Sequence, residues 1–401
     1  MRKNNSKVNQ QVINFISTLS IYMKLLSIGC GYIGSVLAEE LVNSLDFEEM
    51  IICDTTQEKI EETAKNLGER VIPLQLDISN YSNLLEIMEN FDLVIGLAPG
   101  RLGFNVMKAC VEKKKNLIDL SFMAEDPFIF QEAALEAGVS IIPDCGVAPG
   151  LSNMLIGKAS SQLDEIEDAI IYVGGLPQNP NPPLNYKVTW CVEDLFEEYT
   201  RKAKIVRNGN SIEVEALEGL EEVEFEGFDK LEGFFTDSVR TLHHTIKAKN
   251  MWEKTLRYPG HVRKIKLLKK LGLLNKKPLQ STNISPWNFM CKFWEENLSF
   301  PEDKDVLLMR IKVSGKKHST KILHTYEVVD YFDEQRNITA MGRSTAYTAF
   351  AVIKLVMENK INKKGIVPPE ILGMNKRIFQ EIQLTLKNKN LKISGKVAEV
   401  K

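Results

Sequence analysis

The sequence predicts an α/β protein in which a doubly wound parallel sheet is followed by an α+β domain with a mostly antiparallel sheet. Between residues 24 and 143, short apolar runs alternate with amphipathic stretches, the pattern of parallel strands joined by helices. Beyond residue 165, β-rich runs are joined by short turns such as Asn208-Gly209, the pattern of hairpins. With 401 residues, of which 44% are hydrophobic, the chain is long enough for two cores.

The first domain is expected to contain a strand for each of its apolar runs. Parallel strands joined by single helices have right-handed crossovers, and their ligands bind at the carboxyl ends of the strands. The predicted strands are Leu25–Ile28, Met50–Cys53, Val71–Leu76, Leu93–Leu97, Asn116–Leu120 and Val139–Ile142.

A glycine-rich turn follows the first of these strands. Gly29, Gly31 and Gly34 have the GxGxxG spacing, with Tyr32 and Ile33 inside the turn, and lead into a helical pattern that begins at Ser35. In such a turn the first glycine allows the tight bend, the second lets the backbone approach a pyrophosphate, and the third lets the helix pack on the strand. This context predicts a dinucleotide site of the Rossmann type rather than a purely structural turn.

The remaining cofactor contacts are expected where the later strands end. Asp54 ends the second strand, twenty residues after Gly34, the position of the carboxylate that binds the ribose hydroxyls of NAD; NADP is therefore disfavoured. Near the adenine we expect Asp77 and Ile78, near the nicotinamide ribose Ala98 and Pro99, and near the nicotinamide Ser121, Phe122 and Met123. Asp77 is equally well explained as a helix N-cap.

A turn-rich segment from Asp144 to Gly150 marks the expected domain boundary. We therefore predict an extension at residues 1–23, an NAD-binding domain at 24–147, a substrate domain at 148–344 and a helical segment at 345–401 that returns to the first domain. In the second domain we expect a strand at Ala169–Val173, a helix from Val192 to Ala203, a hairpin through Asn208-Gly209, and a ribbon of Val306–Val313 with Ile322–Tyr331 that turns at residues 314–317. The substrate would lie in the cleft between the domains.

Candidate catalytic residues are polar groups in or near the second domain. Arg257, Tyr258 and His261 surround a Pro-Gly turn and offer a carboxylate grip, a hydrogen-bond donor and a group that titrates near neutrality. A surface strand end with a capping turn is the alternative. Further candidate catalytic residues are Asp237, Arg240, Glu193 and Glu125. Helix capping and a favourable interaction with the helix dipole explain the individual carboxylates equally well. The histidines lack zinc-ligand spacing with cysteines, so no metal site is expected.

Composition excludes several classes of protein. The formal net charge of −2 gives no reason to expect a nucleic-acid partner, and no apolar stretch is long enough to span a membrane. Six scattered cysteines without CxxC spacing predict reduced thiols and a cytoplasmic protein. The apolar patch at residues 12–16 lacks a cleavage site, so we interpret the extension as an upstream arm rather than a targeting segment.

Seven segments in order resemble the saccharopine dehydrogenase and L-lysine 6-dehydrogenase superfamily. The match runs from about Lys24 to Glu370. It comprises IGCGYIG at Ile28–Gly34, IDLSFMAED at Ile118–Asp126, PDCGVAPGLSN at Pro143–Asn153, YVGGLP at Tyr172–Pro177, FFTDSVRTL at Phe234–Leu242, KTLRYPGH at Lys254–His261 and GIVPPE at Gly365–Glu370. The resemblance implies NAD(P)-linked amine chemistry, an amino-acid substrate, and a homodimer or larger homo-oligomer.

Within the superfamily, the chain is most similar to lysine 6-dehydrogenases. Saccharopine-type enzymes tend to carry an Arg in the segment equivalent to residues 189–193, where this chain has Glu193, an Asp in the turn where it has Ala148, and a His where it has Asn153. An acidic group suits a cationic amine. We therefore expect NAD-dependent oxidative deamination of the ε-amine of L-lysine, with Arg257 and Tyr258 at the α-carboxylate and Glu193 or Glu125 at the amine. The alternatives are a saccharopine or carboxynorspermidine dehydrogenase that uses NADP, and a nucleotide-binding protein without catalysis.

Overall fold

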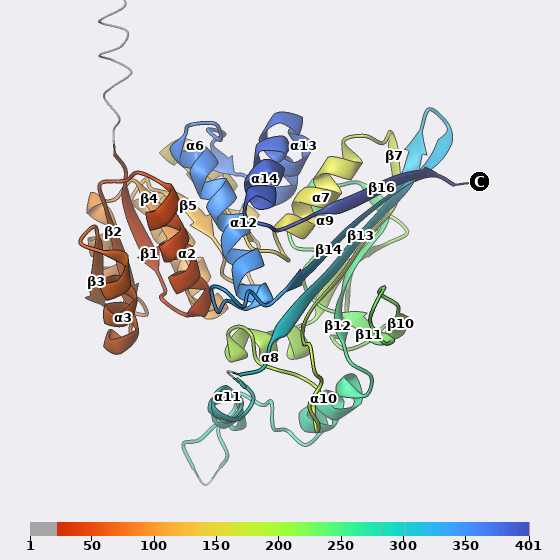
Figure 1. The fold of residues 1–401 in the computed structure, drawn as a ribbon, viewed down its shortest axis with the longest axis horizontal. Coiled ribbons are helices and arrows are strands. Elements are labelled where there is room, and N and C mark those ends of the chain that lie inside the picture. Colours follow the sequence, from red (N-terminus) through yellow and green to blue (C-terminus); the bar gives the residue numbers. More distant parts are fainter. Residues whose placement is uncertain (1–21, 281, 301, 401) are drawn as a thin grey trace, which may run out of the picture.

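Two β-sheets with helices between and around them form the molecule (Figure 1). The structure is a computed structural model that describes residues 22–280, 282–300 and 302–400. One sheet is parallel and the other is mixed, which confirms the predicted α/β class. Most of the N-terminal extension lies outside the described residues.

The parallel sheet has the strand order β15-β6-β5-β4-β1-β2-β3. Chain order reverses between β1 and β4, and in doubly wound sheets this switch point is where a dinucleotide binds. The strands are β1 (Lys24–Ile28), β2 (Glu49–Asp54), β3 (Val71–Gln75), β4 (Leu93–Gly96), β5 (Asn116–Asp119), β6 (Ser140–Ile142) and β15 (Gly365–Ile366). The connecting helices are α2 (Tyr32–Ser44), α3 (Gln57–Leu67), α4 (Tyr81–Ile87), η1 (Met88–Asn90), α5 (Gly100–Glu112), η2 (Pro127–Phe130) and α6 (Gln131–Ala137).

The second sheet has the order β10-β11-β12-β7-β13-β14-β16, with β8 and β9 attached beside β12. Only the β12–β7 pair is parallel among its described pairs, so the sheet is mostly antiparallel as expected. Its strands are β7 (Glu165–Pro177), β8 (Ala203–Arg207), β9 (Asn210–Val214), β10 (Glu221–Val223), β11 (Leu231–Phe235), β12 (Ala248–Arg257), β13 (Asp305–Lys317), β14 (Thr320–Tyr331) and β16 (Ser394–Glu399). Its helices are α8 (Val192–Thr200), α9 (Leu242–Thr245), α10 (His261–Lys270) and α11 (Pro286–Asn297).

The long ribbon turns later than the sequence predicts. β13 continues through residues 314–317, and the turn consists of His318 and Ser319, which have φ values of 46° and 71°. Two consecutive positive φ values match the right-handed twist of the flanking strands in a two-residue hairpin. The glycine at 315 instead marks an irregularity where β13 pairs with β7.

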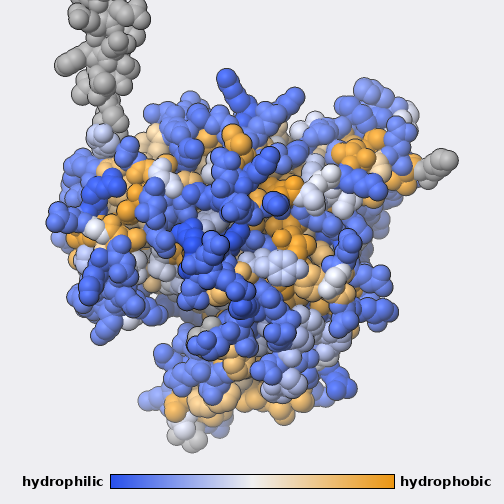
Figure 2. Space-filling view, viewed as in Figure 1, coloured by the Kyte–Doolittle hydropathy of each residue, from blue (hydrophilic) through white to orange (hydrophobic). Residues whose placement is uncertain are grey.

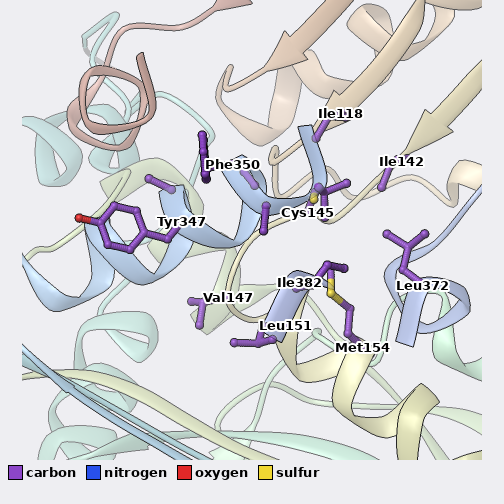
Figure 3. Close-up of a cluster of buried hydrophobic side chains, with 14 of the residues drawn as sticks. Ile118, Ile142, Cys145, Val147, Leu151, Met154, Tyr347, Phe350, Leu372 and Ile382 are labelled. Carbon is purple, nitrogen blue, oxygen red and sulfur yellow. The ribbon is translucent and has the colours of Figure 1, made fainter. Parts of the chain in front are cut away.

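Helix α7 (Leu151–Ser160) and the helices of the C-terminal segment connect the two sheets. α7, α12 (Ala340–Met357), α13 (Pro369–Met374) and α14 (Lys376–Asn388) pack together, and α12 contacts both α2 and β13. Figure 3 shows Tyr347 and Phe350 of α12 in one apolar cluster with side chains of α7, α13, α14 and the parallel sheet. Each large apolar side chain buried there contributes about 1.5–3 kcal/mol. The chain then leaves this cluster, because β16 pairs with β14 in the second sheet.

Among the described residues, no helix is both long and apolar enough to cross a membrane.

Candidate active site

The loop between β1 and α2 has the backbone geometry of a phosphate-binding turn. Gly29 has a φ of 107°, and a Cβ there would lie 2.5 Å from the carbonyl oxygen of Leu97. A Cβ on Gly34 would lie 2.5 Å from the carbonyl oxygen of Gly29, so the helix packs directly on the turn. A Cβ on Gly31 would meet nothing within 4 Å, which leaves room for a pyrophosphate. No side chain caps the N-terminus of α2, so its first N–H groups can bind phosphate.

Asp54 is fixed beside this turn at the end of β2. Its Oδ2 accepts a hydrogen bond from the backbone N–H of Cys30 at 2.8 Å, and its Oδ1 accepts one from the N–H of Thr56 at 3.2 Å. A carboxylate oxygen has a second lone pair, so both oxygens can still accept a ribose hydroxyl. Lys59 of α3 lines the same cleft and brings a cation to this end.

A cleft of about 2010 Å³ extends from the glycine turn past the ends of β4 and β5. The second domain covers it with residues 187–192 and Asp194, whose carboxylate accepts the N–H of Gly100 at 3.0 Å. Ten of the predicted cofactor residues line this cleft: Gly29, Gly31, Tyr32, Ile33, Gly34, Asp54, Ala98, Pro99, Ser121 and Phe122.

Three predicted cofactor residues lie outside the cleft. Asp77 accepts the backbone N–H of Ser79 at 2.9 Å in a tight turn, while the N-cap of α4 is Asn80. Ile78 and Met123 are buried in the hydrophobic core on one face of the parallel sheet, where their side chains pack rather than face a ligand. The expectation for these residues is corrected because the chain turns away from the cleft directly after β3 and after Phe122.

The inner end of the cleft opens onto a second cavity of about 840 Å³. The two spaces share Ile33, Leu120, Phe122, Thr189, Trp190 and Thr345. The charged side chains that line the inner cavity are Asp144, Glu198, Glu253 and Arg257. Asp144 follows β6 in the parallel sheet, whereas the other three come from α8 and β12, so the cavity has charged groups at two ends.

Arg257 is the cation of this cavity, and it is only 3% exposed. Its Nη2 donates a hydrogen bond to Glu198 at 3.2 Å, and its Nε donates one to the Tyr199 hydroxyl at 3.3 Å. The guanidinium carbon also lies 4.7 Å from the centre of the Tyr186 ring. Removing one partner of a buried ion pair costs about 3–5 kcal/mol. Arg257 and Glu198 therefore depend on each other.

His261 contacts Arg257 indirectly, through the Tyr199 hydroxyl. Its Nδ1 faces the carbonyl oxygen of Leu184 at 3.0 Å, which can only accept, so Nδ1 carries the proton. Its Nε2 then accepts the Tyr199 hydroxyl proton at 3.0 Å, and that hydroxyl oxygen accepts from Arg257. Burial lowers the pKa of His261 to about 3, so the ring stays neutral. His261 positions the tyrosine and does not line the cavity.

Glu253 is fully buried beside the ion pair. The Thr236 hydroxyl donates to its Oε2, and the Thr255 hydroxyl donates to its Oε1 at 3.3 Å. Burial raises the pKa of Glu253 to about 8, and the nearby Glu198 carboxylate acts in the same direction. This carboxyl group therefore gains or loses its proton in weakly alkaline solution.

Asp144 is the acid at the other end of the cavity. Its Oδ1 accepts from Nε of Arg240 at 3.0 Å, whereas its Oδ2 has no hydrogen-bond partner among the described residues. Burial raises the pKa of Asp144, although the Arg240 guanidinium opposes that rise. Asp144 therefore lines the cavity with a carboxylate whose second oxygen retains unused acceptor capacity.

The structure brings only part of the predicted catalytic set together. Arg257 lines the cavity and His261 stands behind it, but the Tyr258 hydroxyl donates to the Pro177 carbonyl oxygen at 2.9 Å. Tyr258 points away because side chains alternate along the end of β12. The expected pairing of Tyr258 with Arg257 is therefore corrected.

The other four predicted residues also lie outside the inner cavity. Glu193 is at the surface with Arg101, 3.2 Å away. Glu125, Asp237 and Arg240 line a separate cavity of about 620 Å³, because the segment after β5 and the turn after β11 leave the sheet on the outer side. Arg240 reaches the site only through Asp144, and Asp237 forms an ion pair with Arg201 at 3.1 Å. Neither Glu193 nor Glu125 lies with Arg257 in the inner cavity, and their expected contact with a substrate amine stays a prediction.

Sequence reasoning missed Asp144, Glu198 and Glu253. Polar residues at 253, 255 and 257 recur at every second position, which marks a polar inner face on a strand. That signal was present within the segment that leads to Arg257. Glu198 and Asp144 carried no comparable signal, because one lies in an acidic amphipathic helix and the other in a turn.

Comparisons with known proteins give consistent results. A family model described as the saccharopine dehydrogenase NADP binding domain matches residues 25–142, and one described as the saccharopine dehydrogenase C-terminal domain matches residues 146–391. Mouse (Mus musculus) mitochondrial alpha-aminoadipic semialdehyde synthase is 27% identical over 282 residues, which are 67% of this chain and 30% of that protein. The NADP(+), L-glutamate-forming saccharopine dehydrogenase of Saccharomyces cerevisiae is 24% identical over 62% of this chain and 58% of that protein.

Among solved structures, the apo saccharopine dehydrogenase (L-Glu forming) from Saccharomyces cerevisiae superposes with a TM-score of 0.75 at 18% identity. The superposition covers 94% of this chain and 100% of that one, so the fold is shared throughout. The matched part spans about 30% of the length of the semialdehyde synthases and 58% of that of the fungal dehydrogenases.

Proposed function

The chain belongs to the saccharopine dehydrogenase family, and from that premise we propose that it is a nicotinamide-dependent dehydrogenase of an amine, with the ε-amine carbon of L-lysine as its site of oxidation. NAD is the proposed cofactor. The product would be an imine that water converts to allysine, an aldehyde that cyclises with its own α-amine.

The charge of the inner cavity supports a cationic substrate. Three carboxyl groups line it against a single guanidinium; Glu198 is paired with that guanidinium and Asp144 with Arg240 from outside the cavity, so the unbalanced negative charge is that of Glu253 when it is ionised. Saccharopine carries three carboxylates, which would need more cations than the cavity walls offer. Lysine carries two ammonium groups and one carboxylate, which fits this set. Like charges in a desolvated site are strongly unfavourable. This imbalance is the observation on which the proposal rests.

The cleft fits a dinucleotide. The open space over Gly31 and the uncapped start of α2 suit its phosphates, and Asp54 suits its ribose hydroxyls. When bound, the cofactor accepts a hydride from the substrate carbon. The carboxylate of Asp54 favours NAD, because it would repel a 2′-phosphate.

The two ends of the cavity suggest the orientation of lysine. Asp144 follows a strand of the parallel sheet, near the inner end of the cleft, so we assign its unpartnered oxygen to the ε-amine. Arg257 is assigned to the α-carboxylate, with Glu253 and Glu198 near the α-ammonium. A lysine ammonium titrates near 10.4, so it must lose a proton before the adjacent carbon can release a hydride. The buried carboxyl group of Asp144 can accept that proton, while ionised Glu253 at the other end balances the charge of the α-ammonium.

A saccharopine-type reaction with NADP is the second candidate. Lys59 lines the cleft on the side of Asp54 and could meet a 2′-phosphate. The matching family model is described as NADP binding, and the fungal relatives are named as enzymes of NADP(+).

One assay separates these candidates. Formation of reduced nicotinamide is followed by absorbance at alkaline pH with lysine, ornithine, short diamines and saccharopine, each with NAD and with NADP. Turnover of lysine with NAD supports the proposal, whereas turnover of saccharopine alone refutes it. If no amine is oxidised although the cofactor binds, the chain is a nucleotide-binding protein without this catalysis.

A homo-oligomer in the cytoplasm, with no nucleic-acid or membrane partner, remains our proposal for the protein's surroundings. Figure 2 shows apolar side chains at the lower end of the molecule, over α10 and α11 of Figure 1. Leu267, Leu271, Phe289 and Phe293 there are each at least 47% exposed. Light scattering after gel filtration measures the mass, and a monomer would contradict the oligomer.

A further inference from the structure

We propose that Asp126, His243 and His244 form a binding site for a divalent transition-metal ion of the Zn²⁺ type, at the junction of the two domains and outside the dehydrogenase site. The ligand atoms of these three side chains lie within 4.8 Å of one another. Asp126 comes from the loop after β5, and the histidines come from α9, which follows β11 of the second sheet. Their spacing in the sequence gave no sign of this cluster, because 117 residues separate Asp126 from His243.

The hydrogen bonds leave Nε2 of His243 available for a metal, and an ion would replace the hydrogen bond between Asp126 and His244 with release of its proton. Nδ1 of His243 contacts the carbonyl oxygen of Arg240, which can only accept, so Nδ1 carries the proton and Nε2 presents its lone pair. A backbone carbonyl on the far nitrogen is the usual outer support of a metal-binding histidine. Oδ2 of Asp126 lies 2.5 Å from Nε2 of His244, whereas its Oδ1 accepts the N–H of Phe128.

The surrounding structure holds the three side chains in place. The Thr241 and Thr245 hydroxyls, at the start and end of α9, donate to the two oxygens of the buried Glu370 at 3.1 and 2.6 Å. The Phe128 ring stands edge-on against His244, with 5.0 Å between the ring centres. These contacts fix the elements that carry the cluster, and a zinc ion would bring the three ligand atoms to distances of about 2.0–2.2 Å from itself.

The local charges allow a cation. Of the guanidinium groups that line the neighbouring cavity, Arg201 is paired with Asp237 and Arg240 is paired with Asp144. Lys202 lies 3.6 Å from Glu215. Lys204 opposes a cation, and the Glu125 and Glu213 carboxylates of the same cavity offset it. Three protein ligands leave one position of a tetrahedral ion for water.

Co²⁺ is the probe, because its visible absorption reports tetrahedral nitrogen and oxygen ligands. Full-length protein without an affinity tag is stripped with a chelator, titrated with Co²⁺ and then displaced with Zn²⁺, and calorimetry gives the stoichiometry. We expect one ion per chain, and at least tenfold weaker binding in Asp126→Asn, His243→Ala and His244→Ala. The exposed histidine variant His318→Ala, at the turn of the β13–β14 ribbon, should bind as the wild type does.

Asp126→Asn keeps an oxygen to cap η2, so its circular dichroism and cofactor affinity should match the wild type even if a histidine variant misfolds. Absence of binding in the wild type overturns the proposal. Unchanged binding in Asp126→Asn and His244→Ala, or equal loss in His318→Ala, overturns it as well. None of these results depends on the substrate of the dehydrogenase site.

Discussion

Replacing Glu253 by Gln should stabilise the protein at alkaline pH while impairing its activity. The pKa of Glu253 rises from 4.5 to about 8 in the folded chain because burial disfavours its charge. Each pKa unit corresponds to about 1.4 kcal/mol, so the ionised form costs the fold up to about 5 kcal/mol. Glutamine is neutral and has both an acceptor and a donor for the Thr236 and Thr255 hydroxyls, so it avoids this cost without losing both hydrogen bonds.

The sign of the pH dependence follows from the raised pKa. Below about pH 4.5 the carboxyl group is protonated in the folded and unfolded chains, and it contributes no difference. As the pH rises to about 8, the unfolded chain releases this proton first, so the wild type loses stability over that interval. The advantage of Glu253→Gln should therefore grow by up to about 4 kcal/mol between pH 5 and pH 9, as measured by urea unfolding.

Buried acids that do not interact with Glu253 titrate equally in both proteins and cancel in the difference, whereas the neighbouring Glu198 carboxyl group loses a like charge and adds to it. Glu136→Gln, at an exposed position of α6, is the matched control and should show no such trend. Because Glu253 is assigned to the α-ammonium, Glu253→Gln should also lower kcat/KM for lysine by about tenfold or more through a higher KM, with the affinity for NAD unchanged. A stability difference that is the same at pH 5 and pH 9 would refute the assignment of a buried, raised pKa to Glu253.

Three further predictions concern the glycine turn, the cation and the cofactor. Gly31→Ala should fold with nearly unchanged stability but raise KM for the cofactor, whereas Gly29→Ala should destabilise the fold because the φ of Gly29 is 107°. Thermal unfolding measures the stability of each variant, and cofactor titration measures its affinity. Equal melting temperatures for the two variants would contradict the prediction. Arg257→Lys should raise KM for lysine much more than KM for NAD in steady-state kinetics, and equal effects on both would count against the role of Arg257. Arg257→Ala should also destabilise the protein by about 3–5 kcal/mol because Glu198 loses its partner. Asp54→Asn should lower the preference for NAD over NADP by about tenfold or more in the ratio of kcat/KM, and an unchanged ratio would show that this carboxylate does not select the cofactor.

Local sequence was sufficient for the elements whose signals are local. The glycine spacing and the apolar runs predicted the cleft and most of the lining residues that the first domain contributes, since each strand end lies at the same edge of the parallel sheet. The prediction failed at Asp77, where a turn stabilised within three residues carries the side chain away from the cleft. It also failed for the ribbon turn, because the register of β13 with β7 and β14 places the bend at His318.

The sequence by itself determined the α/β class and the glycine turn, and it singled out the segment that carries the Arg257 cation, because these depend on residues close together along the chain. Only the tertiary structure decided which carboxyl groups surround that cation. Glu198, Glu253 and Asp144 come from a helix, a strand of the second sheet and a strand end of the first, and they meet because α12 and its neighbours hold the two sheets against each other. Burial at that junction changes the pKa values of these groups, a property that no single segment of the chain possesses.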